Sequence, residues 1–577
     1  MTDTTAVIPG ERRLRPAFHP GPETIILGIL ALFVATISLA PLGRLALTAI
    51  APEGILDLTS AWNTLAKPRV FTAAINSLYV ALASTLLAVI IGSLAALLSV
   101  HGNMRYKAAW VFGFVLPLMI PPQVTALAWV QAFSPTSPVL GFLGLALTPG
   151  MRHPLFSAWG IIFLLGIYNA PLVFLTVRAA LRRLPANLSE AARASGAGNV
   201  QLIFTILLPL ARSGIFAGAA IAFVSAIGNF GIQAMLGIPA RFPTLITLIY
   251  QQLNSYGPSA LSDMASLSLL LSLITVIALG LSTWLGGRGD LRVEEGGRPA
   301  QINLGRWKTP VEIGAWLYLA ATLLLPMSAL VATSLVKGFG QKLSLDTVTP
   351  ANYTNALFHH VSIRDAFATS FMLTVTTVIL LSVISLVLAY FISWKKSTLV
   401  RLIQMAAELS YVLPGIILGV AMILFFLLPL PLLGFSIYGT IWIILAAYLS
   451  NFLALALRPM LGGFSQIDRS LEEAARVAGA DFFQRIRDII LPLLAPAVIA
   501  GGIIVFMSAL NEIQVSILLV SSSARTIGPM IVFLEEGGSS TLAAAVGCLM
   551  ILIVLALMGI ASLFANRLPK GALPWHD

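Results

Sequence analysis

Leu471–Pro492 reads LEEAARVAGADFFQRIRDIILP and forms a polar, charged island in a chain that is otherwise mostly apolar. Its frame, E-A-A-x3-G-x9-I-x-L-P, also occurs 283 residues earlier with the same internal spacing. The matched positions are Glu190, Ala191, Ala192, Gly196, Ile206, Leu208 and Pro209 in the first copy and Glu473, Ala474, Ala475, Gly479, Ile489, Leu491 and Pro492 in the second. Because seven positions repeat at half the chain length, the sequence indicates an internal duplication.

The composition is that of a membrane protein. Of 577 residues, 58% are hydrophobic and 10% are charged, which excludes an ordinary soluble protein. Apolar runs of about 20 residues recur, long enough to cross a bilayer core of roughly 30 Å as helices. The first run, Thr24–Thr48, is longer than the core of a signal peptide, so we expect it to be retained as a span. The predicted fold class is an all-α polytopic membrane protein of two repeated six-helix halves and about twelve transmembrane helices.

The apolar runs also set the expected domains. The predicted spans are Thr24–Thr48, Asn76–Val100, Ala108–Phe133, Trp159–Leu181, Gly214–Leu236, Met264–Leu285, Ile313–Val336, Thr369–Ile392, Ile403–Leu427, Tyr438–Leu457, Ala497–Leu519 and Ala543–Phe564. The predicted order is an N-terminal tail (1–23), a first domain (24–285), a polar linker (286–310), a second domain (311–566) and a C-terminal tail (567–577). The repeated stretches, 187–210 and 470–493, join spans four to five and ten to eleven.

The basic residues predict the orientation of the spans. Cytoplasmic loops carry an excess of Lys and Arg, and a cytoplasmic N-terminus places 25 of the 34 basic residues inside and 9 outside. In this orientation both repeated stretches and both termini are cytoplasmic. The net charge of +11 is then explained by topology, and we expect no nucleic-acid partner.

Each repeated stretch is predicted to form two short helices joined at a glycine. Ser470 and Glu473 have the spacing of a capping box, and Asn187 with Glu190 is a weaker counterpart in the first copy. The alanine pair that follows each glutamate gives a helix surface with little bulk, suited to close approach by another protein.

Gly196 and Gly479 are suited to the left-handed conformation that ends a helix and turns the chain. Pro209 and Pro492 are expected at the start of the next span, where the missing N–H costs little. A structural alternative is that Glu473 merely caps an interfacial helix. A cap alone would not fix the isoleucine and the Leu-Pro pair downstream.

The duplicated frame resembles the EAA loop of importer-type ABC transporter permeases, the segment that docks on the cytoplasmic ATPase. Two copies in one chain resemble the fused double permeases of the iron(III), thiamine and aminoethylphosphonate uptake systems. The resemblance implies that Glu190, Ala191, Ala192, Gly196 and Pro209 couple the first half to the ATPase. Their counterparts in the second half are Glu473, Ala474, Ala475, Gly479 and Pro492.

The resemblance also implies the assembly: an ATPase homodimer inside, a substrate-binding protein outside, and a location in the bacterial inner membrane. The sequence contains no G-x-x-x-x-G-K-[ST] phosphate loop. We therefore expect no cofactor and no enzymatic activity in this chain, with ATP bound by the partner. A secondary transporter driven by an ion gradient could also have twelve spans and a repeat, but it would not need the paired EAA stretches. A membrane scaffold would not need polar residues within its spans.

Polar residues in spans five and eleven are candidates for the transport pathway. Alignment of the halves on the EAA frame places Gly228-Asn229 opposite Asn511-Glu512. Such groups are costly within a span and usually face a cavity or a partner. Asn229, Asn511 and Glu512 are therefore expected near the outward mouth of a pore between the halves. An interhelical hydrogen bond without a role in transport is the alternative.

Prolines supply the remaining pathway candidates. Pro121-Pro122 and Pro414-Gly415 align in spans three and nine, where they free backbone carbonyls that protein or a wet cavity must satisfy. A gate and a simple kink are both compatible with this pattern. Glu408 is a further intramembrane acid to which the resemblance assigns no role.

The substrate is the least determined feature. Leu236–Phe242, after span five, resembles iron(III)-type permeases most, so iron(III) is the favoured substrate. Aminoethylphosphonate, thiamine and polyamine systems share much of this frame and remain alternatives. His359-His360 has no nearby third ligand in the sequence, so we expect a solvated loop and no metal site in this chain.

Overall fold

The computed structural model describes residues 21–563, apart from residues 53, 149, 254, 256–258, 288–300, 396 and 430–433. Within this part of the chain, nine helices are long and apolar enough to cross a membrane, and three bent helix pairs raise the number to as many as twelve. These elements follow the order of the twelve predicted spans, which confirms an all-α polytopic membrane protein. Most of the two predicted tails and the middle of the predicted linker lie outside the described residues.

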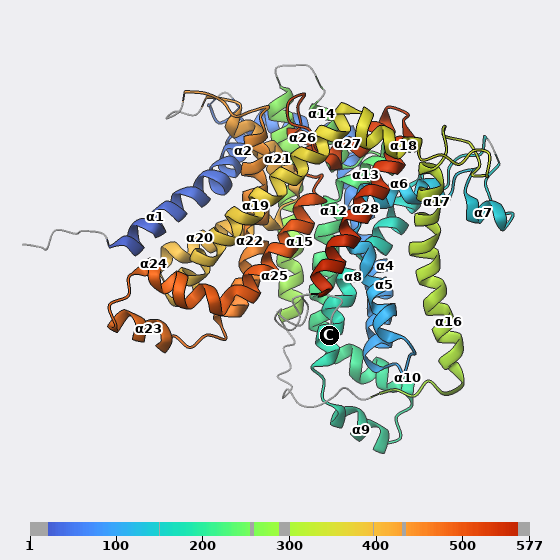
Figure 1. The fold of residues 1–577 in the computed structure, drawn as a ribbon, viewed down its shortest axis with the longest axis horizontal. Coiled ribbons are helices and arrows are strands. Elements are labelled where there is room, and N and C mark those ends of the chain that lie inside the picture. The colour runs from blue at the N-terminus through green and yellow to red at the C-terminus, as the bar shows by residue number, and fades with distance from the viewer. Residues whose placement is uncertain are drawn as a thin grey trace, which may run out of the picture.

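The helices form two consecutive sets that we call the first half (21–287) and the second half (301–563) (Figure 1). The first half contains α1 (Pro22–Val34), α2 (Ala40–Ile50), α3 (Leu58–Leu65), α4 (Pro68–His101), α5 (Lys107–Met119), α6 (Pro122–Ala132), α7 (Pro138–Phe142), α8 (Ala158–Arg182), α9 (Ala186–Ala194), α10 (Asn199–Leu202), α11 (Leu208–Leu210), α12 (Arg212–Gly228), α13 (Phe230–Gly237), α14 (Leu245–Leu253) and α15 (Ala260–Gly287). The second half contains α16 (Lys308–Leu319), α17 (Leu325–Ser334), α18 (Ala351–Thr354), α19 (Val361–Trp394), α20 (Thr398–Val412), α21 (Gly415–Phe426), α22 (Ile441–Phe464), α23 (Ser470–Val477), α24 (Phe482–Arg485), α25 (Leu491–Leu510), α26 (Ser516–Leu519), α27 (Ile527–Glu536) and α28 (Ser540–Leu563).

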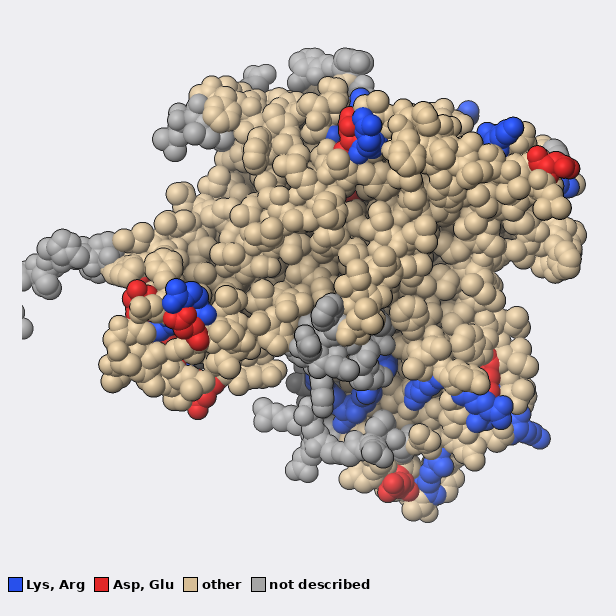
Figure 2. All heavy atoms as spheres, in the orientation of Figure 1, with Lys and Arg blue, Asp and Glu red and all other residues tan. Residues whose placement is uncertain are grey.

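The outer surface of the helices is apolar where lipid would contact it. On α4, Leu82, Leu86, Ile90 and Leu94 recur every four residues and are each at least half exposed. In water such a stripe would be costly, whereas in a bilayer it contacts acyl chains. In Figure 2 the charged side chains gather towards opposite ends of the molecule, and the surface between them is mostly uncharged. This distribution matches a protein that spans a membrane.

Four helices contain a π turn directly before a proline. The π turns are Ala35–Leu39 before Pro41, Ile203–Leu207 before Pro209, Ala320–Leu324 before Pro326, and Ile486–Ile490 before Pro492. In each case the residue that precedes the proline donates its N–H to the carbonyl five residues back, as Leu491 does to Ile486. The wider turn moves aside the carbonyl with which the proline ring would clash. The four sites occupy equivalent positions in the two halves, so the duplication extends to backbone detail.

These π turns correct the prediction for Pro209 and Pro492. Neither proline begins a helix, because the helical segment already starts at Asn199 in the first half and at Phe482 in the second. In the first half a 67° bend separates the segment Asn199–Leu210 from α12, whereas Phe482–Leu510 is one membrane-length segment in the second half. The prolines therefore lie inside helical segments that emerge from the EAA loops.

Spans five and eleven were predicted as continuous helices, Gly214–Leu236 and Ala497–Leu519. The structure shows both to be wrong, because α12 ends at Gly228 and α25 ends at Leu510. Short helices, α13 and α26, follow after a break. Apolar composition continues across both breaks, so hydropathy alone could not reveal them.

Spans three and nine are broken at the prolines that the sequence singled out. The axes of α5 and α6 differ by 105°, and those of α20 and α21 differ by 113°. Ile120 and Leu413, which precede Pro121 and Pro414, both have extended backbone conformations, as the steric demand of the following proline ring favours. Each half thus contains two broken segments.

The first helical segment of each half packs against the other half. In the first half α1 lies against α19 and α20, and α2 lies against α21. The hydroxyls of Ser38 and Ser450 are 2.9 Å apart across this contact. In the second half α17 packs on α6, and the Trp110 indole donates a hydrogen bond of 3.0 Å to the carbonyl of Ala315 in α16. The two halves therefore exchange their first helical segments, because each of these segments packs on the other half.

The tightest packing lies between α4, α8 and α12. A Cβ atom added to Gly92 of α4 would lie 2.6 Å from the carbonyl oxygen of Ala170 in α8. One added to Gly218 of α12 would lie 2.4 Å from the Thr176 hydroxyl oxygen. Small residues allow helix backbones to approach closely in a membrane, where van der Waals contact replaces the hydrophobic effect between helices. The EAA loop of the first half lies between α8 and α12, so these closely packed helices hold both of its ends.

Candidate functional site: two surface helices and a central cavity

The two EAA loops form exposed helices at the same end of the molecule, α9 in the first half and α23 in the second (Figure 1). Glu190 and Glu473 are exposed, as are Ala191 and Ala474, whereas Ala192 and Ala475 are half-buried. Two apolar side chains beside the second copy are also exposed, Leu471 by 48% and Val477 by 90%.

Both helices end at their glycine in the predicted left-handed conformation. Gly196 has φ +85° and Gly479 has φ +88°. The N–H of the next residue bonds the carbonyl five positions back, from Ala197 to Ala192 at 3.0 Å and from Ala480 to Ala475 at 3.0 Å. This pattern satisfies carbonyls at the helix end and fixes the direction in which the chain leaves. The predicted turn is confirmed in both copies.

The predicted capping box at Ser470 and Glu473 is wrong. Ser470 is already the first helical residue, and Glu473 pairs with Arg469 at 3.1 Å instead of with the backbone. Asp468 takes the capping role, since its carboxylate accepts a hydrogen bond of 2.9 Å from the Ser470 N–H. That bond lowers the pKa of Asp468 below its ordinary value. The Glu473 carboxylate is thus held at the surface.

The weaker counterpart in the first copy is wrong as well, because α9 begins after Pro185 without a side-chain cap. A complete capping box does exist, one helix later. Asp481 accepts a hydrogen bond of 2.8 Å from the Gln484 N–H, and Gln484 accepts one of 2.9 Å from the Asp481 N–H. The box fixes the start of α24, directly after the Gly479 turn.

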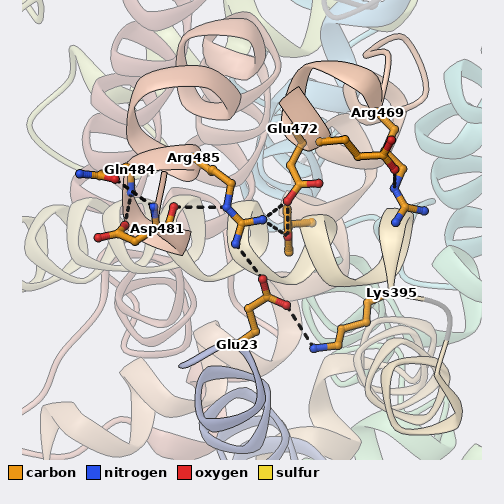
Figure 3. Close-up of polar contacts among 9 residues, drawn as sticks. Glu23, Lys395, Arg469, Glu472, Asp481, Gln484 and Arg485 are labelled. Atoms are coloured by element: carbon orange, nitrogen blue, oxygen red, sulfur yellow. Dashed lines mark hydrogen bonds and ion pairs between the residues drawn. The ribbon is translucent and has the colours of Figure 1, made fainter. Parts of the chain in front are cut away.

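A group of charged residues between α23, α24 and α1 was not identified from the sequence. Arg485 bonds Glu472 of α23 and Glu23 of α1, and Lys395 approaches Glu23 (Figure 3). The alternation of charge within LEEAARVAGADFFQRIRD was visible. Nothing in the sequence placed Glu23, more than 440 residues away, beside it.

A cavity of about 660 Å³ lies between the two halves. Its lining comes from the broken segments of both halves and from α8, α15 and α22. All of the predicted pathway residues line it, namely Pro121, Pro122, Asn229, Pro414, Asn511 and Glu512. The structure thus brings together residues from four places that are far apart in the chain. Their contact with a solute remains a prediction.

The side chains of Asn229 and Glu512 each cap the short helix that follows them in their half. The Asn229 side-chain oxygen accepts a hydrogen bond of 3.0 Å from the Ile232 N–H, which caps α13. The Glu512 carboxylate accepts from the N–H groups of Val515 at 2.6 Å and Ser516 at 3.0 Å, which caps α26. Asn229 directly follows the end of α12, and Glu512 lies two residues beyond the end of α25, so the prediction that they lie inside continuous spans is wrong. Their polar groups satisfy the backbone that the breaks expose.

Asn511 makes an interhelical hydrogen bond, which was the alternative to a role in the pathway. Its side-chain amide donates to the carbonyl of Met119, 3.0 Å away in the other half. In the equivalent position of the first half, Gly228 lies against Pro414, so that an added Cβ would be 3.1 Å from the proline. The broken segments of the two halves therefore meet at two related contacts beside the cavity.

Arg458 is a charged residue of the cavity wall and directly follows Leu457, where the predicted span ten ends. The helix is longer than predicted, because α22 continues to Phe464 and carries Arg458 within it. Its guanidinium lies 2.9 Å from the Glu408 carboxylate and 4.5 Å from the centre of the Tyr411 ring. The arginine side chain remains 50% exposed. The cavity thus has a paired cation on the side of the second half.

The duplicated fold, with a cavity between its halves, agrees with the comparison with known families. The profile of the binding-protein-dependent transport system inner membrane component matches residues 88–288 and 382–570. The chain belongs to this family. Both matched regions contain one EAA loop, so the chain is a double permease.

Similar curated proteins are permeases of ABC transporters. The probable ABC transporter permease protein y4fN of Sinorhizobium fredii is 26% identical over 559 residues, which cover 95% of this chain and 96% of that protein. The ferric transport system permease protein FbpB of Actinobacillus pleuropneumoniae is 24% identical over 77% of this chain and 64% of that protein. The molybdenum transport system permease protein ModB of Escherichia coli K12 is 30% identical over 30% of this chain and 73% of that protein.

The chain is accordingly the multi-pass inner-membrane permease of an ABC importer, a transport protein and not an enzyme. Membership in this family implies an ATPase and a substrate-binding protein as partners. The double-length relatives include ferric permeases, and the molybdenum relatives match a part of the chain.

Proposed function

We propose that this permease imports iron(III) by alternating access and that α9 and α23 dock on a cytoplasmic ATPase homodimer. The observation that carries the docking proposal is the repeated geometry of the two loops. Each presents a surface glutamate and an alanine pair on a short helix that a left-handed glycine ends. The two copies lie at one end of the molecule, as a dimeric partner with two equivalent clefts requires.

The proposed orientation places this end in the cytoplasm, with both termini on the same side. The excess of basic residues there supports it, even with Arg458 assigned to the cavity. Closure of the ATPase dimer on ATP would bring α9 and α23 together. Because each loop continues into a helical segment that ends at the cavity, a rotation of the loops would move the breaks that line it. ATP is bound by the partner, and we propose no cofactor in this chain.

The substrate proposal rests on the relatives that span both halves. A second ferric relative, Fe(3+)-transport system permease protein FbpB 2 of Haemophilus influenzae, is 22% identical over 82% of this chain and 86% of that protein. Glu512 adds a carboxylate at the cavity, a group that would attract a cation. Aminoethylphosphonate, thiamine and polyamines are the alternatives that share the EAA frame.

A molybdenum oxyanion is the second candidate, because molybdenum permeases match and because Arg458 lines the cavity. The test is uptake into proteoliposomes with the cognate ATPase and binding protein, supplied with iron(III) or with molybdate. The proposal predicts ATP-dependent accumulation of iron and none of molybdate. Accumulation of molybdate alone would overturn the substrate. Accumulation that proceeds without the ATPase would overturn the docking role and favour an ion-driven transporter.

A further inference from the structure

Arg485 is a buried charged residue at the base of the second EAA loop. It is the last residue of α24, and its side chain is 6% exposed. Its guanidinium bonds the carboxylate of Glu472 in α23 and lies 2.8 Å from the carboxylate of Glu23 in α1. A third contact, 3.2 Å to the carbonyl of Asp481, fixes the side chain to its own helix. One arginine thus joins the docking helix to the first helix of the chain.

The group around Arg485 is balanced in charge (Figure 3). Lys395, at the end of α19, lies 3.4 Å from Glu23, and the Tyr390 hydroxyl donates to Glu472 at 3.2 Å. Two cations therefore face two carboxylates. Buried ions are retained only when paired, because an unpaired one pays the full cost of leaving water. The arrangement holds α23 in one position relative to α1 and α19.

The contact between Arg485 and α1 bears on both halves of the protein. By sequence α1 starts the first half, but it packs on α19 and α20 of the second half. It continues through α2, which lies against α21 of the second half and α15 of the first. A displacement of α23 that is transmitted through Arg485 would therefore reach both halves.

The first EAA loop is held by different chemistry. The positions equivalent to Glu472 and Arg485 are Ser189 and Leu202, which are 3% and 1% exposed. Leu202 packs in an apolar cluster with Leu184 and Leu207. The loop reaches the other half through neutral groups, since the Asn199 side chain donates to the carbonyl of Asn303 at 3.2 Å.

We propose that Arg485 is a positioning residue that transmits the movement of α23 to α1. Its ion pairs with Glu472 and Glu23, which we call the strap, couple the second docking helix to both halves. The inference rests on the proposed docking of α23 on the ATPase. It assigns the two loops unequal parts: the second depends on the pair Arg485–Glu23, and the first on apolar packing around Leu202.

The test is a transplant between the halves. The double variant Glu472→Ser/Arg485→Leu gives the second loop the residues of the first, and Glu23 keeps its contact with Lys395. Substrate-stimulated ATP hydrolysis and solute uptake are measured together in proteoliposomes with the full complex. The expected result is that stimulated hydrolysis persists while solute accumulated per ATP falls at least about fivefold, the size of a typical coupling between sites. Unchanged accumulation per ATP would overturn the proposal.

Single variants separate this role from a merely structural one. Glu23→Ala should lower accumulation per ATP as the double variant does, and Glu23→Gln should lower it less. Arg485→Lys keeps the positive charge and should retain most of the wild-type accumulation per ATP. If the double variant does not reach the membrane, Glu23→Ala decides, because Glu23 lies at the edge of the group with a side chain that is 23% exposed. Wild-type accumulation per ATP in Glu23→Ala would overturn the strap.

A further variant, Gly479→Val, separates this proposal from the docking proposal on which it rests. If Gly479→Val keeps stimulated hydrolysis, the docking of α23 itself fails. If it loses stimulated hydrolysis while the double variant matches the wild type in accumulation per ATP, only the strap fails.

Discussion

Substitution of Gly479 by valine tests the turn that sets the orientation of α23 relative to the rest of the second half. Gly479 has φ +88°, and nothing lies within 4 Å of a Cβ atom added there, so the cost comes from the backbone and not from a clash. A non-glycine residue in the left-handed region costs about 1–2 kcal/mol, and a β-branched one lies at the upper end. Since 1.4 kcal/mol is about a factor of ten, the population of the native turn should fall by about tenfold or more.

The assay is ATP hydrolysis by the reconstituted complex, with and without loaded binding protein. Gly479→Val should reach the membrane and retain basal hydrolysis but lose most of the stimulation. Gly479→Asn should recover part of it, because asparagine tolerates the left-handed conformation. Gly54, with φ +81° and equally open space, is the matched control at the opposite end, and Gly54→Val should leave stimulation unchanged. Full stimulation in Gly479→Val, or equal loss in Gly54→Val, would show that the turn at Gly479 does not set the position of α23.

Further predictions follow from the same contacts. Glu512→Gln keeps an oxygen that can cap α26, so insertion should be normal while uptake of a cationic solute falls more than that of an anionic one; equal uptake of both would leave Glu512 a cap only. Glu473→Ala removes a surface pair and should not alter thermal stability, whereas Glu472→Ala takes the more buried of the two carboxylates from Arg485 and leaves it Glu23, so it should destabilise the protein by less than the roughly 3–5 kcal/mol that an unpaired buried charge costs; similar melting temperatures of the two variants would contradict the assigned contacts. A reporter inserted in residues 286–310 should signal cytoplasm and one between Val336 and Thr369 the exterior, and the reverse result would overturn the orientation.

The repetition of the sequence predicted much of this structure. Glycine at the same place in two polar stretches predicted the turns at Gly196 and Gly479, since few other residues adopt φ near +85° without strain. Prolines at aligned positions in the two halves, Pro121 and Pro414, predicted the breaks before α6 and α21, because a proline ring restricts the backbone of the residue before it. Both are local rules, in which a residue constrains its immediate neighbours.

Other features depend on residues distant in the chain, and the sequence could not reveal them. Glu472 and Glu473 are adjacent acids, yet one is buried against Arg485 and the other is exposed, and only the packing of α23 decides which. The exchange of the first helices leaves no mark in hydropathy, because α1 is apolar against either half. Pro492 was compatible with a helix start, and the π turn before it arises because the helix had already begun at Phe482.

Site-specific cross-linking tests the docking of the two EAA loops most directly. The chain has a single cysteine, Cys548, which is buried, so Cys548→Ser provides a background for Glu190→Cys, Glu473→Cys and an opposite-end control, Gly54→Cys. If α9 and α23 dock on the ATPase, the cysteines at positions 190 and 473 cross-link to the ATPase subunit in the assembled complex and the one at position 54 does not. Cross-linking from position 54 alone, or from none of the three in a complex that hydrolyses ATP on stimulation, would contradict this docking.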